Sequence, residues 1–401
     1  MNSLHNHHHR RPRRHYRRPA PVFRYSYGQP YGYGYAQPIS SSPYASNYSG
    51  SFSGYPITPA YVPIVHREHH HGGASACASG VNLGAVVVTS LKWNATGITV
   101  AGVTGVSDST PDKLNQPTGL SIDSNGTLYI ADQGNCRVQK WLSGAPNGTT
   151  MVGQPNATCG SGPSLLQSAL GGLVDSNSNV YVVDTYNHRV QLWSYGASFG
   201  TMVAGTGFGG SANNQLYYPS GIEMNPTTGT LYVSDTWNHR IMSYLANTSS
   251  GTVVAGGNGP GTNSTQLYCP MGIYLDLTSN SLYIANYYSH NIVYWVIGAT
   301  SWTLVTGDIN GMSGNSPTML YCPYDVEVDY MGNIYVADSY NNRIQFFQAG
   351  SMNGTTIAGV TGVSGPDAYH LSYPVALKLD SQLNLYVTDC YNYRVQKFLH
   401  Y

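Results

Sequence analysis

The feature that most constrains the fold is a stretch of 14 residues, VYVVDTYNHRVQLW at 180–193, which recurs in near copies along the chain. The six copies begin 51 or 52 residues apart, at Leu128, Val180, Leu231, Leu282, Ile334 and Leu385. A fixed period of this size is typical of a solenoid, a propeller or an array. The chain must therefore fold as one structural unit used six times.

Each repeat is predicted to contain four short strands. The copy itself holds two runs rich in β-branched and aromatic residues, such as LYIAD and RVQKW, on either side of a polar tetrapeptide. A strand such as SGIEMN precedes the copy, and a strand such as GTVVAG follows it. We name these strands A to D from the axis outward. Six such antiparallel sheets around an axis make an all-β, six-bladed β-propeller.

The two ends of the repeat region are predicted to meet in the last blade. The sequence stops at Tyr401, directly after the third strand of the sixth copy, and a matching lone strand, GITVAG at 97–102, precedes the first copy. We expect this N-terminal strand to complete the last blade, because that closes the ring and removes an exposed sheet edge.

These repeats resemble the NHL repeat. The shared pattern is a Pro, a strand ending in Asp, a turn with Gly, then LYVAD, N-H-R and an apolar run, and Asn187-His188-Arg189 is close to the namesake tripeptide. The resemblance covers roughly residues 93–401. NHL-like propellers include RNA-binding and ubiquitin-ligase-associated modules, extracellular sensor domains and a zinc-dependent lyase of hydroxyglycine peptides, so the resemblance implies the fold and no single function.

The chain is expected to have two parts, a low-complexity and mostly disordered tail at 1–75 and the propeller at 76–401. The tail is rich in His, Arg, Tyr and Gly and has few aliphatic residues that could form a core. It holds eight Arg and one acid, a net charge of +7, whereas 76–401 holds ten basic and 17 acidic residues, a net charge of −7. This complementarity predicts that the tail docks onto a neighbouring copy, which gives open filaments unless rotation closes them.

The signals for cellular location disagree. No apolar signal-peptide region follows Met1, and the longest apolar run, AVVVTSL from Ala85, is too short to span a membrane. Eight N-x-S/T sequons occur, at Asn47, Asn94, Asn125, Asn147, Asn156, Asn247, Asn263 and Asn353. Five of the seven in the propeller fall on the face formed by the A–B and C–D turns. Tight turns favour Asn-Gly in any case. The alternative, which we adopt, is a glycosylated face on an extracellular protein, with a cytoplasmic location as the other interpretation.

The six cysteines are even in number, as expected for a disulfide framework. Cys136 and Cys159 belong to one blade edge and one face, so we predict a disulfide between them. Cys77 with Cys390 would tie the end of the tail to the closing blade. Cys269 and Cys322 fill equivalent positions in successive blades, where the Cα separation can exceed the limit for a disulfide, and are left unpaired. Buried free thiols are the alternative for each pair.

The B–C loops carry an Asp, then Asn three and Arg five residues on, as in Asp184, Asn187 and Arg189. The fourth copy has Asn286, Ser289 and Asn291 instead. Repetition around a ring indicates architecture, because a catalytic centre needs different residues that converge on one point. We expect the fourth blade to be the least well tied, and a candidate for partner docking.

No catalytic residues, cofactor or metal site are predicted, and the protein is not expected to be an enzyme. His188, His239 and His290 share one offset in consecutive blades and should not converge on a zinc ion. Every Arg of 76–401 belongs to the loop motif, so the propeller lacks the basic patch that nucleic-acid binding requires.

One face of the propeller is predicted to be aromatic. Two residues after the loop Asp, or after Asn286 in the fourth copy, come Tyr186, Trp237, Tyr288, Tyr340 and Tyr391, and the D–A loops of the same face add Tyr217, Tyr218, Tyr268, Tyr321 and Tyr373. Either these rings pack between blades, or some form an exposed surface suited to sugars, Tyr or Arg.

The sequence favours a secreted, non-enzymatic structural or interaction protein that binds a protein partner or itself, with glycans as further contacts. Two alternatives remain. An intracellular binding scaffold would have reduced cysteines and no glycans, and a peptide lyase would need bound zinc.

Overall fold

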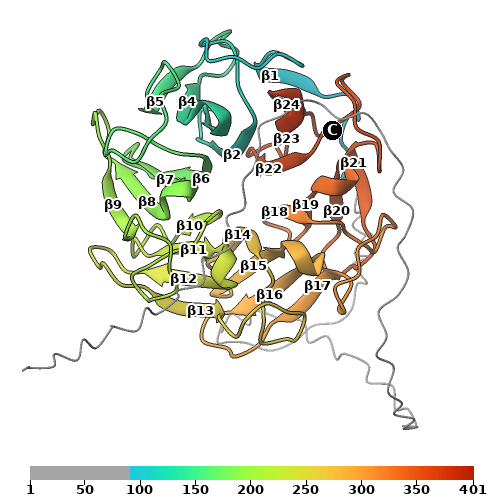
Figure 1. Ribbon diagram of the computed structural model, residues 1–401. Coiled ribbons are helices and arrows are strands. Elements are labelled where there is room, and N and C mark those ends of the chain that lie inside the picture. The colour runs from blue at the N-terminus through green and yellow to red at the C-terminus, as the bar shows by residue number, and fades with distance from the viewer. Residues whose placement is uncertain (1–90) are drawn as a thin grey trace, which may run out of the picture. The chain divides into compact units, whose positions relative to one another are not determined.

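Four strands per repeat pair into one antiparallel sheet, and six sheets surround a common axis in the computed structural model, which describes residues 91–401 (Figure 1). The predicted six-bladed β-propeller is thereby confirmed. The predicted tail and its boundary at residues 75 and 76 lie outside the described residues and stay predictions.

The strand bounds repeat from blade to blade. Blade 1 holds β2 (Pro117–Ile122), β3 (Leu128–Asp132), β4 (Arg137–Trp141) and β5 (Thr149–Gly153), and blade 2 holds β6 (Ala169–Val174), β7 (Val180–Asp184), β8 (Arg189–Trp193) and β9 (Thr201–Gly205). Blade 3 holds β10 (Ile222–Met224), β11 (Leu231–Asp235), β12 (Arg240–Tyr244) and β13 (Thr252–Gly256), and blade 4 holds β14 (Pro270–Asp276), β15 (Ser281–Asn286), β16 (Asn291–Val296) and β17 (Thr303–Gly307). Blade 5 holds β18 (Pro323–Val328), β19 (Ile334–Asp338), β20 (Arg343–Phe347) and β21 (Thr355–Gly359), and blade 6 holds β22 (Pro374–Leu379), β23 (Leu385–Asp389), β24 (Arg394–Phe398) and β1 (Ile98–Gly102).

The N-terminal strand closes the ring, as predicted. β1 pairs antiparallel with β24, so that Ile98 lies opposite Lys397 and Gly102 opposite Arg394 (Figure 1). Just before β1, the indole N–H of Trp93 donates to the backbone carbonyl of Leu383 at 2.8 Å. The outer edge of the last blade is thereby covered by the chain's own N-terminal segment.

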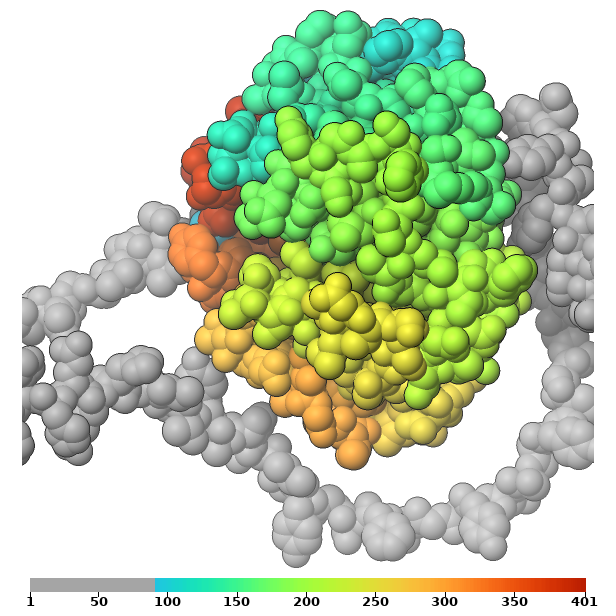
Figure 2. Space-filling view, turned by 90° about the vertical axis from the view of Figure 1, so that its left-hand side faces the viewer, coloured from blue at the N-terminus to red at the C-terminus, as the bar shows by residue number. Residues whose placement is uncertain are grey.

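The hydrophobic core lies mainly at the seams between neighbouring blades. At one seam, Val183 and Val190 of blade 2 pack with Leu231 and Val233 of blade 3, and all four side chains are almost completely buried. Neighbouring blades are in direct contact at the rim as well (Figure 2). Each blade therefore depends on its neighbours for burial, as in other repeat architectures.

Glycines let the innermost strands approach each other around the axis. A Cβ on Gly171 would lie 2.4 Å from the carbonyl oxygen of Ser220, and one on Gly221 would lie 2.3 Å from that of Met271. Because those atoms belong to the backbone of the next blade, a side chain could not be accommodated without moving a strand.

Candidate functional site

The aromatic face is built by one loop conformation used six times. After the B strand the chain makes a three-residue 3₁₀ turn and then a residue in the left-handed region before the C strand. The six turns are η1 (Gln133–Asn135), η2 (Thr185–Asn187), η3 (Thr236–Asn238), η4 (Tyr287–Ser289), η5 (Ser339–Asn341) and η6 (Cys390–Asn392). The left-handed residues are Cys136, His188, His239, His290, Asn342 and Tyr393, with φ between 51° and 57°. The middle residue of each turn is the one that the sequence assigned to the aromatic face.

In five blades a buried carboxylate organises this loop. Asp184, which has no exposed side-chain surface, accepts hydrogen bonds from Arg189 Nε at 2.8 Å and from Asn187 Nδ2 at 2.9 Å. Its other oxygen accepts the backbone N–H of Gln167 in the D–A loop at 2.7 Å. The same three kinds of bond recur at Asp132, Asp235, Asp338 and Asp389. The motif therefore ties each B–C loop to the D–A loop of its own blade, in agreement with the architectural interpretation.

The arginines of the motif complete the tie by donating to D–A carbonyls. Each arginine donates to one backbone carbonyl of the D–A loop, two residues before the residue whose N–H bonds to the Asp. These carbonyls belong to Lys113, Leu165, Gln215, Met319 and His370, and the distances are 3.0–3.3 Å. Burial raises the pKa of Asp132 above its ordinary value, while its hydrogen-bond donors, the Asn115 N–H, Asn135 and Arg137, act in the opposite direction. All five guanidinium groups are engaged in these intramolecular bonds.

The fourth blade is tied differently. Asn286 Oδ1 still accepts the backbone N–H of Tyr268 at 2.6 Å. The indole N–H of Trp302 donates to the Gln266 carbonyl at 2.8 Å, which is the carbonyl that an Arg reaches in the other five blades. Asn286 Nδ2 and Asn291 Oδ1 are buried and have no hydrogen-bond partner within residues 91–401. The expectation of a weaker tie is therefore correct for the side chains of the motif, while Trp302, which the sequence did not single out, replaces part of it. Docking of a partner at this blade stays a prediction.

The three histidines bridge neighbouring blades rather than converge. His188, His239 and His290 each accept on Nδ1 a backbone N–H from the next blade's entry loop, those of Tyr218, Cys269 and Cys322, at 3.1 Å in each case. Asn342 Oδ1 makes the equivalent bond to the N–H of Tyr373 at 3.0 Å. A backbone N–H can only donate, so the three Nδ1 atoms carry no proton. Burial lowers the pKa of all three imidazoles. We call these hydrogen bonds, each of which connects two neighbouring blades, the histidine latches.

The rings of the aromatic face both pack and remain exposed. Tyr186, Trp237, Tyr288, Tyr340 and Tyr391 keep between 45% and 54% of their surface accessible. They also contact D–A loop rings at centroid distances of 4.9–6.5 Å, namely Tyr186 with Tyr218, Trp237 with Tyr217, Tyr288 with Tyr268, Tyr340 with Tyr321 and Tyr391 with Tyr373. Except for Tyr186 with Tyr218, these contacts lie within one blade, so the rings pack mainly against their own D–A loop rather than between blades, and about half of each ring stays exposed. The face is an arc of half-exposed rings over blades 2 to 6, interrupted at Gly134 in blade 1.

One buried tyrosine connects the arc across two blades. Tyr287, in the fourth blade, shares a hydrogen bond with Tyr373 through their hydroxyl groups at 2.9 Å, although the two are 86 residues apart. Its ring also contacts Tyr324 and Tyr340 at centroid distances of 5.9 and 6.4 Å. Burial raises the pKa of Tyr287 well above that of a free phenol. This bond fixes the entry of the sixth blade against the fourth.

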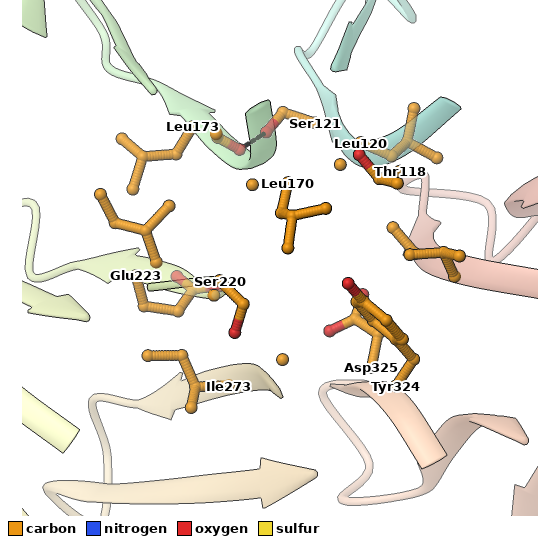
Figure 3. A pocket seen from close by; sticks show the side chains of 18 of the residues that line it. Thr118, Leu120, Ser121, Leu170, Leu173, Ser220, Glu223, Ile273, Tyr324 and Asp325 are labelled. Atoms are coloured by element: carbon orange, nitrogen blue, oxygen red, sulfur yellow. Dashed lines mark hydrogen bonds between the residues drawn. The ribbon is translucent and has the colours of Figure 1, made fainter. Parts of the chain in front are cut away.

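A group of charged residues that the sequence motifs did not single out lies in the central channel, where a cavity of about 70 Å³ is lined by the six innermost strands (Figure 3). Glu223, Glu327 and Lys378 occupy the same offset, that is, equivalent positions, of the innermost strand in blades 3, 5 and 6. Asp325 stands in blade 5 at a position of this strand where blades 1 to 4 have a glycine. Lys378 Nζ forms an ion pair with Glu327 and lies 3.8 Å from Glu223. Reading the inner strands at that offset, where Ser121, Leu173 and Tyr274 are the other members, would have revealed this group.

The channel shifts the ionisation of its own side chains. Burial raises the pKa of Glu223 to about 7 and that of Asp325 to about 6, although Lys378 acts in the opposite direction. Burial opposes the charge on Lys378, but the neighbouring carboxylates outweigh it and raise the pKa of this ammonium group. Lys378 already pairs with the two glutamates, and Asp325 accepts the backbone N–H groups of Val326 and Leu377. No set of three or more His, Cys, Asp or Glu within residues 91–401 is arranged to hold a metal ion.

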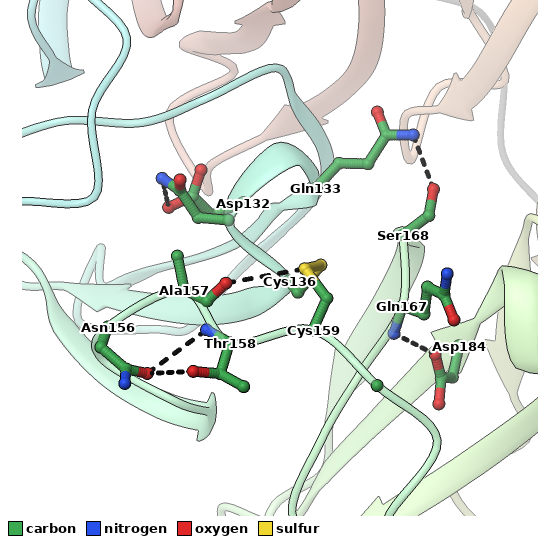
Figure 4. The surroundings of a disulfide bond; sticks show 12 residues. Asp132, Gln133, Cys136, Asn156, Ala157, Thr158, Cys159, Gln167, Ser168 and Asp184 are labelled. Carbon is green, nitrogen blue, oxygen red and sulfur yellow. Dashed lines mark hydrogen bonds between the residues drawn. A yellow bond between two sulfur atoms is a disulfide. The ribbon is translucent and has the colours of Figure 1, made fainter. Parts of the chain in front are cut away.

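The predicted disulfide between Cys136 and Cys159 is present, with a Cα–Cα distance of 5.3 Å (Figure 4). It joins the left-handed residue of the first B–C loop to the chain that leads into blade 2, where blades 2 to 4 use a histidine latch. Cys269 and Cys322 are buried free thiols, as the alternative had it. Cys390 is likewise a buried thiol, and its candidate partner Cys77 lies outside the described residues.

All seven predicted glycosylation sites within the described part are exposed: Asn94, Asn125, Asn147, Asn156, Asn247, Asn263 and Asn353. Asn125 lies in an A–B turn, and Asn147, Asn247 and Asn353 lie in C–D turns, on the face opposite the aromatic arc. Glycosylation itself stays a prediction. No helix in the described residues is long and apolar enough to cross a membrane.

Comparisons with known proteins agree with this fold. The chain is 24% identical over 304 residues to Protein SUPPRESSOR OF QUENCHING 1, chloroplastic, of Arabidopsis thaliana. The aligned part covers 70% of this chain but only 24% of that protein. An auxiliary nutrient binding protein of Bacteroides thetaiotaomicron shares the fold at 16% identity and a TM-score of 0.57, over 77% of each chain. A gluconolactonase of Xanthomonas campestris does so at 12% identity and a TM-score of 0.53, over 76% of this chain and 97% of its own. The sequence pattern of the NHL repeat matches residues 114–141, 216–242, 320–347 and 371–398, and the chain is therefore an NHL-repeat β-propeller.

Proposed function

We propose that this propeller is a non-enzymatic interaction protein that works outside the cell and binds a protein partner, in the first instance another copy of itself, through its aromatic face. The observation that carries the proposal is the arc of half-exposed rings over five blades. Contiguous exposed apolar surface often marks an interaction site on a soluble protein. Tyr and Trp supply large contact areas at low entropic cost.

The chemistry of the loops supports binding rather than catalysis. The Asp, Asn, Arg and His side chains of the B–C loops are used in buried ties within and between blades. The charged groups of the channel partner one another. A nutrient-binding protein and a gluconolactonase share the fold, so the fold alone does not decide between binding and catalysis.

The extracellular part of the proposal is supported by the disulfide and by the exposed sequons. Disulfides persist in oxidising compartments and are rare in the cytosol, and Cys136–Cys159 is formed. A glycan-coated face opposite the aromatic face would leave only one broad surface for contact. Intact mass of the protein from its native source, before and after glycosidase and reduction, tests this. An unmodified and fully reduced mass contradicts the extracellular location and favours an intracellular scaffold.

Self-assembly through the basic tail at 1–75 completes the proposal. Its support is the charge of +7 on the tail against −7 on the remainder. Sedimentation of the full chain over a range of concentrations should show association that is lost in Tyr288→Ala/Tyr340→Ala/Tyr391→Ala and in a chain lacking 1–75. The matched control is Tyr195→Ala/Tyr330→Ala, which removes exposed rings outside the arc. Equal association of all four proteins contradicts the proposal.

A further inference from the structure

Two pairs of tyrosines on the aromatic face are held together in a repeated geometry. In blade 4 the backbone N–H of Tyr288 donates to the carbonyl of Tyr268 at 3.1 Å, and in blade 5 that of Tyr340 donates to Tyr321 at 3.2 Å. The rings of each pair then contact each other, with centroids 5.2 Å apart in the first pair and 4.9 Å apart in the second. The backbone bond thus fixes one phenol beside another in both blades.

All four phenols are open to solvent. Tyr268 and Tyr321 are 38% exposed, and their partners Tyr288 and Tyr340 are 45% and 49% exposed. None of the four hydroxyl groups has a hydrogen-bond partner within residues 91–401. This differs from Tyr287 and Tyr373, whose hydroxyl groups bond to each other in a more buried position. A reagent in solution can therefore reach both members of each exposed pair.

We propose that Tyr268–Tyr288 and Tyr321–Tyr340 are sites of oxidative tyrosine coupling, in which hydrogen peroxide and a peroxidase join the two rings of a pair by a carbon–carbon bond. Two phenols already in contact react as an intramolecular pair, and holding reactants in place raises such rates by orders of magnitude. The modification does not depend on the identity of any binding partner.

The chemistry balances with peroxide as the oxidant. Each phenol gives up one electron and one proton, and the two phenoxyl radicals form a bond between their ortho carbons. The hydrogen atoms on those carbons move back to the oxygens, which restores both aromatic rings. The pair has then lost two hydrogen atoms, and one molecule of peroxide has become two molecules of water.

The cross-link would join two loops of the aromatic face. Tyr321 lies in the loop that leads into β18, and Tyr340 lies in η5, so the new bond would join the D–A and B–C loops of the same blade. The buried Asp338 already joins these loops through Arg343 and the N–H of Tyr321. A covalent bond at the surface would thus repeat, in an irreversible form, the tie that the polar network makes below it.

The chain contains its own comparison pairs. In blade 3 the equivalent residues are Tyr217 and Trp237, again joined by a backbone hydrogen bond, of 3.1 Å, and by ring contact at 6.5 Å. A tryptophan cannot form the bis-phenol product, so the Tyr217–Trp237 pair serves as a negative control within the same protein. Tyr330 is the matched control for exposure, because it is 83% exposed and no ring of the described residues contacts it.

The experiment treats dilute full-length protein with hydrogen peroxide and a peroxidase, then maps the digested peptides by mass and by the fluorescence of the coupled product. We expect monomeric protein to yield two main cross-linked peptides, Tyr268–Tyr288 and Tyr321–Tyr340, each lighter by two hydrogen atoms than the peptides it joins. The pairs Tyr186–Tyr218 and Tyr391–Tyr373 should react less, because Tyr218 and Tyr373 are less exposed. Tyr340→Phe should remove only the second peptide and Tyr288→Phe only the first, while Tyr330→Phe should leave both unchanged. These replacements keep the ring, so folding is preserved. Absence of both peptides, or cross-links distributed according to exposure with Tyr330 among the main products, overturns the proposal.

Discussion

The indole N–H of Trp302 lies 2.8 Å from the Gln266 carbonyl, at the position where an arginine side chain donates in every other blade. The residues equivalent to Trp302 in blades 1, 2, 3 and 5 are Gly148, Gly200, Gly251 and Gly354. Blade 4 has therefore exchanged an Arg and a Gly for Asn291 and a Trp. One repeat can lose its buried ion pair and keep its fold, because the carbonyl that the arginine would satisfy still receives a donor.

This exchange predicts a specific rescue. Trp302→Gly should destabilise the protein by about 3–5 kcal/mol, the usual cost of truncating a buried Trp. It also leaves the Gln266 carbonyl without its donor. The combined change Asn286→Asp/Asn291→Arg/Trp302→Gly should recover much of that loss, because it installs the tie of the other blades. Urea unfolding measures both variants. A combined variant no more stable than Trp302→Gly would show that the two solutions are not equivalent.

The histidine latches predict sensitivity to acid. Burial holds the imidazole pKa of all three histidines below its ordinary value of about 6.5. Protonation at Nδ1 would also place a second donor against the N–H of Tyr218, Cys269 or Cys322. The unfolded state then binds more protons, and stability is lost as pH falls below about 6.5.

The chain supplies the matched variant for this effect. Asn342 makes the same bond with a group that does not titrate. We expect His188→Asn/His239→Asn/His290→Asn to melt with a smaller loss between about pH 7.5 and pH 5 than the unaltered protein. An equal loss in both proteins would exclude the latches as the source.

The channel carboxyls predict the opposite trend over an overlapping pH range. Because the pKa of Glu223 is raised to about 7, the folded state holds a proton that the unfolded state releases, and stability falls as pH rises from about 4.5 through 7. Glu223→Gln should reduce that fall. Lys378→Met should cost about 1–3 kcal/mol at neutral pH, because it leaves the partly buried Glu223 and Glu327 side chains without their cation, and less near pH 5, where Glu223 holds a proton. A cost for Lys378→Met that does not vary with pH would contradict this account of the channel.

The disulfide predicts a loss of stability on reduction. Cys136–Cys159 closes a short loop with a sequence separation of 23, so its removal should cost about 2–4 kcal/mol. Thermal unfolding with and without a reductant, with Cys136→Ser/Cys159→Ser as the matched variant, measures this cost. If reductant lowers the melting temperature of the double variant as well, the effect arises elsewhere.

The repeated features of the chain were predictable from its sequence. Six registers agree on where strands lie, and the positions of Cys136 and Cys159 within one blade were enough to pair them. The single-copy features do not stand out in the repeat pattern. Glu223, Glu327 and Lys378 come from three different blades and meet only because the inner strands converge on the axis. Trp302 replaces an arginine that is absent from its own repeat, and Tyr287 reaches Tyr373 across an intervening blade. Each of these contacts occurs once in the ring, so the pattern shared by the repeats does not encode it.

The most direct test of the aromatic face as an interaction surface is oxidative footprinting of the full chain at low and at high concentration. If copies associate through this face, labelling of Trp237, Tyr288, Tyr340 and Tyr391 should fall with concentration, while labelling of Tyr330 stays constant. Association with unchanged labelling of these four rings, or with protection confined to Tyr330 and the opposite face, would contradict the central claim.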